Sequence, residues 1–198
     1  MFQFGVAIRM TIVSVVLLGL IYPLAMTGAA QAIFPREANG SLVMRDGKVV
    51  GSDIIGQLWS KPEDFQGRPS AAGKNGYDPT ATGGTNLGPT SAKLIAATKA
   101  TIAQLRKQNP QATLPVPIDL VTSSGSGIDP DISVRGAYYQ APRVAFARHL
   151  QLARVDALIA RAIEPRELGI LGEPHVNVLE LNLALDALSK RGGRPSKD

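Results

Sequence analysis

The sequence predicts an α+β protein, with one N-terminal transmembrane helix followed by one mixed α/β domain outside the cytoplasm. Three observations predict it: an N-terminal run without charge, a β-hairpin pattern just after it, and later segments with the apolar spacing of amphipathic helices. The predicted division, in chain order, is a cytoplasmic segment (1–9), a transmembrane helix (10–35), a soluble domain (36–189) and a basic, disordered tail (190–198).

Residues 10–35 carry no charged side chain, and Arg9 and Arg36 bracket them. About 20 helical residues are enough to cross a hydrocarbon core about 30 Å thick, so the run predicts an uncleaved anchor. Arg9 favours a cytoplasmic N-terminus and an exported C-terminal domain. The alternative is a cleaved secretory signal with an A-x-A-like site at Ala30–Ala32. In both alternatives the domain after the apolar run is exported.

After the anchor, residues 41–50 predict a β-hairpin, because Asp46-Gly47 suits a tight turn between two β-prone arms. Residues 56–90 are rich in Gly, Pro, Ser, Thr and Asn, with aromatic residues among them, which indicates an ordered loop region. Thr90 or Ser91 is expected to cap a helix that ends near Gln108.

The second half predicts further helices and one strand. A short helix is expected near Ser133, with Pro142 in the first turn of another. Residues 155–163 have the spacing of an amphipathic helix. The alternation in residues 176–181 indicates a strand, and a helix is expected over 183–188.

Composition excludes several classes of function. The 21 Lys and Arg residues outnumber the 16 Asp and Glu residues, but the excess lies near the chain ends, so a nucleic-acid partner is not predicted. Without cysteine there is no disulfide, thiolate nucleophile or Cys-ligated zinc. His149 and His175 are assigned no partner residues, and no metal site is predicted. No G-x-S-x-G or D-K-T-G sequence occurs, so no catalytic residue is assigned.

Two features are candidates for binding an anion. The backbone of Ser124-Gly125-Ser126-Gly127 can form a nest of N–H donors, although the same residues are typical of an ordinary turn. Gln140 and Arg143 lie one helical turn apart and can share a surface. Arg143, Arg148, Arg154 and Arg161 give the later helices a basic side, which is either a solvated face or a surface for a partner or phosphate.

Several long motifs, in order, resemble the C subunit of the Kdp potassium-transporting ATPase, the KdpC family. They are Gly67–Ala71, Gly83–Thr90, Asp119–Thr122, Ser124–Pro130, Gln140 with Arg143–Ala145, Leu171–Pro174, Val176–Leu179 and Leu181–Asp186. Two positions depart from the family pattern: Asp131 stands where a histidine is expected, and His175 where an arginine is expected.

The resemblance implies an accessory subunit in the bacterial inner membrane. Its implied partners are a potassium-translocating, channel-like subunit and a P-type ATP-hydrolysing subunit. It also implies a catalytic chaperone that raises the ATP affinity of the pump, with no tightly bound cofactor and with Ser124–Gly127, Gln140 and Arg143 near the nucleotide. An exported domain cannot reach cytosolic ATP, so physical reasoning favours assembly and gating. The alternative function is a membrane-anchored exported protein that binds a small anion or glycan.

Overall fold

The structure is a computed structural model that describes residues 2–192. The chain divides into two units, Met1–Ser52 and Asp53–Asp198. The predicted hairpin therefore belongs to the same unit as the N-terminal helix. The rest of the predicted basic tail, 193–198, lies outside the described residues.

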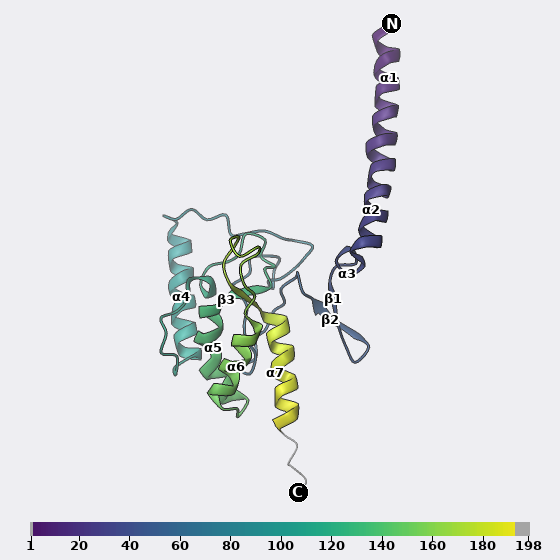
Figure 1. The fold of residues 1–198 in the computed structure, drawn as a ribbon. Helices are drawn as coiled ribbons and strands as arrows, with labels where there is room; N and C mark the ends of the chain where they lie inside the picture. The colour runs from purple at the N-terminus through teal and green to yellow at the C-terminus, as the bar shows by residue number, and fades with distance from the viewer. Residues whose placement is uncertain (1, 193–198) are drawn as a thin grey trace. The chain divides into compact units, whose positions relative to one another are not determined.

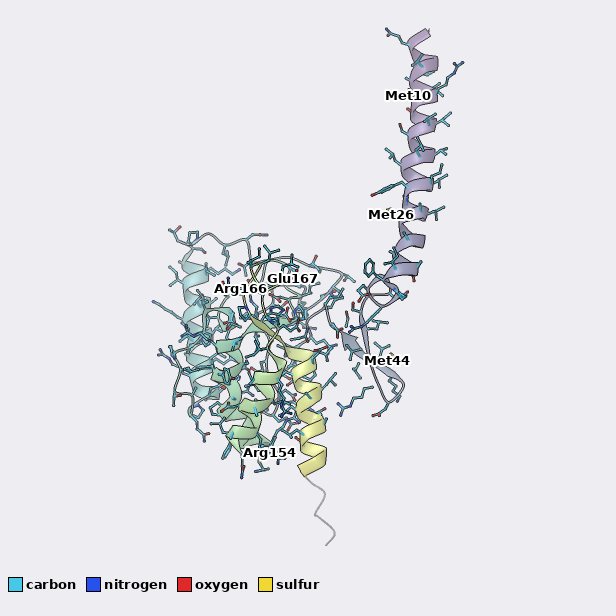
Figure 2. The ribbon with its side chains drawn as sticks, in the orientation of Figure 1. Met10, Met26, Met44, Arg154, Arg166 and Glu167 are labelled. Atoms are coloured by element: carbon cyan, nitrogen blue, oxygen red, sulfur yellow. The ribbon has the colours of Figure 1, made fainter. Side chains whose placement is uncertain are left out.

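The first unit begins with a long apolar helix. It is made of α1 (Phe2–Ser14), a π-helical stretch η1 (Val15–Ile21) and α2 (Tyr22–Ile33). The helix Gln3–Ile33 is long enough to cross a membrane. Its most apolar stretch has a mean hydropathy of 2.3, and none of that stretch is buried. Met10 and Met26 lie along it (Figure 2). The π-helical stretch ends just before Pro23, which has no N–H to donate to the preceding turn.

The predicted hairpin follows a short helix, α3 (Pro35–Ala38). Strands β1 (Leu42–Arg45) and β2 (Lys48–Ser52) pair antiparallel. Asp46 and Gly47 connect them with φ of 51° and 76°. These left-handed values explain why an Asp-Gly pair occupies the turn.

The second unit is mostly helical. Its elements are α4 (Ala92–Gln108), η2 (Ile118–Leu120), β3 (Asp131–Ser133), α5 (Val134–Ala147), α6 (Leu152–Ala162), β4 (His175–Asn177) and α7 (Val178–Gly192). Strands β3 and β4 pair antiparallel, and α5 and α7 follow them directly. Helices α5, α6 and α7 pack side by side (Figure 1). The predicted α+β class with an N-terminal apolar helix is confirmed.

The core lies between these helices and the loop that precedes α4. Phe65 is fully buried, and its backbone N–H and C=O bond to the amide of Asn182 in α7, at 2.8 and 2.9 Å. The expected ordered loop region is confirmed, since Tyr77 also donates to the Arg68 carbonyl at 2.6 Å. The other large, fully buried side chains are Ile132, Ile159, Leu181, Leu185, Gln140, Val144, Val155 and Val176.

Two predicted boundaries are wrong. Pro142 lies inside α5 rather than in the first turn of a new helix, because α5 buries most of one face and this packing outweighs the cost of an interior proline. The strand predicted over 176–181 ends at Asn177. Its side chain accepts from the Glu180 N–H at 3.2 Å, so the helix α7 begins at Val178.

Candidate functional site

Gln140, on α5, is almost completely buried, at 1% exposure. Its side-chain oxygen accepts from the Gln66 N–H at 2.9 Å, and its NH₂ group donates to the Gln66 carbonyl at 3.0 Å. The amide therefore mimics a neighbouring strand and holds the loop that contains Phe65.

Arg143 is the hub beside it. Its Nη2 donates to the Gln140 Oε1 at 2.8 Å, and its Nε donates to the Asn109 Oδ1 at 3.0 Å. Its Nη1 donates to the carbonyl of Asp64 at 3.1 Å and to that of Pro62. Burial lowers the pKa of this guanidinium to about 10. The side chain thus joins α5 to the end of α4 and to the loop.

The interpretation of the arginines as a solvated face is wrong for two of them. Arg143 is 8% exposed. The Arg148 side chain, 11% exposed, pairs with Asp64 at 2.8 Å and with Asp186 at 2.7 Å. A buried guanidinium must be paired or hydrogen-bonded, and the loop carbonyls and carboxylates meet that need.

Ser124–Gly127 forms a turn that its own serines stabilise. The Ser124 Oγ accepts from the Gly127 N–H at 2.9 Å, and the Ser126 carbonyl accepts from the Gly83 N–H at 2.8 Å. Ser70 donates to the Gly127 carbonyl at 2.5 Å. The turn therefore ties together two parts of the loop that precedes α4, around Ser70 and around Gly83, whereas Gln140 and Arg143 belong to a separate network.

A third group was missed by sequence reasoning. His175, on β4, lies 3.8 Å from the Asp131 carboxylate on β3 and 3.6 Å from that of Glu164. Its Nδ1 lies 3.0 Å from the Glu173 carbonyl. Glu164 and Glu173 lie near the two ends of the loop between α6 and β4, on which Figure 2 labels Arg166 and Glu167. The available signal was that both Asp131 and His175 depart from the family pattern.

Electrostatics make this group sensitive to pH. Burial, with Asp129 and Glu164 nearby, raises the pKa of Asp131 to about 6. The bond to the Glu173 carbonyl and the charges of Asp131 and Glu164 raise the pKa of His175. The protonated imidazole therefore stabilises the fold at low pH, and this contribution is lost as the pH rises through its folded pKa.

The variant Asp131→Asn tests whether the ionised carboxylate of Asp131 destabilises the fold. Because burial raises the pKa of Asp131 from 3.8 to about 6, its ionisation penalises the folded state as the pH rises between those values, and the penalty is complete above them. We expect the variant to be more stable than the parent by about 1 kcal/mol near neutral pH, a figure reduced because the side chain is 30% exposed. Near pH ~3.5 the two should be equal. Urea denaturation at both pH values measures this, and a difference independent of pH would contradict it.

Comparison with known proteins assigns the chain to a family. The family model described as "K+-transporting ATPase, c chain" (KdpC) matches residues 4–187. This chain belongs to the KdpC family. The predicted resemblance is confirmed, and with it the expectation of a non-catalytic subunit of a potassium-transporting ATPase.

Relatives named "Potassium-transporting ATPase KdpC subunit" match over most of their length. The protein from Methylococcus capsulatus is 51% identical over 94% of this chain and 98% of its own. That from Acidobacterium capsulatum is 54% identical over 92% of this chain and 96% of its own. That from Caulobacter vibrioides is 57% identical over 87% of this chain and 86% of its own. The KdpC-family match thus covers both units.

Proposed function

We propose that this chain is a membrane-anchored accessory subunit that assembles and stabilises a potassium-transporting ATPase. The observation that carries the proposal, with family membership, is the helix Gln3–Ile33, whose most apolar window is entirely unburied within the chain. Such a surface is stable only against lipid or partner helices. Gly19 and Gly28 allow close approach of another helix, because only a side-chain methyl of Val15 would meet a Cβ at Gly19, and nothing would at Gly28.

The proposed partners are a channel-like, potassium-translocating subunit and a P-type ATP-hydrolysing subunit. The second unit lies outside the cytoplasm in this proposal, as Arg9 before the apolar run favours. Any effect of the chain on ATP affinity is then indirect and passes through subunit contacts. The buried, fully engaged amide of Gln140 supports this, because direct contact with ATP would require breaking its bonds to Gln66.

Deleting the chain tests assembly. We expect a deletion strain to lose growth at low potassium and the remaining subunits to lose stable association in detergent, because the anchor and the second unit no longer hold them. Potassium-limited growth and co-purification measure these effects. Restoration by the full chain is the control, and normal high-affinity uptake in the deletion strain would refute the proposal.

Thiol labelling tests orientation. The chain has no cysteine, so Lys99→Cys on the exposed side of α4 gives a single reactive site. We expect an impermeant thiol reagent to label it in intact cells. The matched variant Gln3→Cys, in the predicted cytoplasmic segment 1–9 that precedes the uncharged run, should label only after permeabilisation. The reverse pattern would place the second unit in the cytoplasm and reopen direct contact with ATP.

A further inference from the structure

Two adjoining hollows in the second unit lie along α4, the loop that precedes it and the end of α5. The first has a volume of about 370 Å³ and includes Trp59 and Gln104 in its lining. The second, of about 560 Å³, includes Phe146 in its lining. Ser60, Gln66 and Gln108 line both hollows, so the two hollows adjoin. We call this feature the amide groove.

Free amide groups line the amide groove. Gln104 and Gln108 lie one turn apart on α4, and Gln66 faces them from the loop. Within residues 2–192, the side-chain amides of these three glutamines make no hydrogen bond. An amide offers both a donor and an acceptor, as a peptide group does. The groove can therefore bond to the main chain of an extended segment.

Apolar rings flank these amides. Phe146 is 71% exposed although it is a large aromatic residue. Trp59 lines the other hollow, and it also packs against the core. Aromatic residues are enriched in surfaces that bind other proteins. They provide contacts for the side chains of a bound segment.

The charge of the groove indicates which charge a bound segment carries. In the described part of the chain, its charged lining residues are Arg68, Lys107 and Arg143, and none is acidic. Arg143 is fully engaged within the protein, but the Nε of Arg68 is buried without a partner among the described residues. Its Nη1 bonds to Asp129 at 2.8 Å. A carboxylate would complement Lys107 and the exposed part of Arg68.

We propose that the amide groove binds an extended segment of a partner subunit of the ATPase that carries at least one carboxylate. This rests on the proposed accessory function and names a surface through which the subunits associate. Backbone groups of the segment bond to the glutamine amides, its apolar side chains contact Trp59 and Phe146, and its carboxylate lies toward Arg68 and Lys107.

The first experiment changes the charge of the groove in the full complex. Gln104→Glu with Gln108→Glu places two carboxylates where the segment lies, so we expect subunit dissociation in detergent to become at least about tenfold faster. The matched control, Ala92→Glu with Ala96→Glu, adds the same charges at the same spacing on exposed positions of α4 at least two turns before Gln104 and should leave the rate unchanged. Equal rates in both variants would overturn the proposal, provided circular dichroism shows both folded.

The second experiment identifies the occupant. A photo-crosslinking amino acid at position 104 of the assembled complex should capture a partner peptide containing Asp or Glu, found by mass spectrometry. Crosslinks only to lipid, to a small molecule or glycan, or to a second copy of this chain would overturn the proposal, as would no crosslink. If the deletion strain has lost potassium uptake while these results are negative, the groove proposal fails and the accessory function stands.

Discussion

Arg143→Ala should destabilise the second unit by about 3–5 kcal/mol, because several buried hydrogen-bond acceptors lose a charged donor at once. The variant leaves the carbonyls of Pro62 and Asp64 without their donor, and removes a partner of Asn109 and Gln140. Urea denaturation of the detergent-solubilised chain, without nucleotide, measures the loss.

Arg154→Ala is the matched control, because it removes another arginine from an exposed position on α6. Its expected effect is within about 0.5 kcal/mol. If the two variants proved equally stable, the hub role of Arg143 would be wrong. A role limited to nucleotide contact would instead leave Arg143→Ala stable and raise the KM for ATP of the complex.

Local signals predicted much of the fold. Asp46-Gly47 favours one turn type, and the hairpin forms there. The Ser91 side chain accepts from the Leu94 N–H at 3.4 Å, which is the expected helix cap of α4. The uncharged run predicted the apolar helix, because hydropathy depends on composition alone. Each of these features is determined by neighbours in the sequence.

The features that were not predicted depend on contacts between distant residues. The bonds of Gln140 and Arg143 reach residues 74 and 81 positions earlier, so the sequence showed that these two could share a surface but not that the surface is buried. The group around His175 exists because β3 and β4 pair across more than one helix. Pro142 shows the same limit, since tertiary packing of α5 outweighs a local helix signal.

Gly127→Ala should cost about 2–4 kcal/mol of stability, the sum of left-handed backbone strain and overpacking. The residue has φ of +72°, and an added Cβ would lie 2.8 Å from the Cβ of Ala72 and 2.8 Å from the Gly83 carbonyl oxygen. The variant would therefore separate this turn from the two parts of the preceding loop that bond to it, around Ser70 and Gly83. Chemical denaturation measures the loss.

Gly125→Ala separates the structural role of the turn from nucleotide contact. An added Cβ at this position meets nothing within 4 Å, so we expect a stability change within about 0.5 kcal/mol. If ATP approached this backbone, as the family resemblance implies, the same methyl group would obstruct it and raise the KM for ATP of the complex several-fold. We expect an unchanged KM, because the serines and glycines of the turn bond to one another and to neighbouring loops. A raised KM in a fully stable Gly125→Ala complex would show instead that the loop contacts nucleotide.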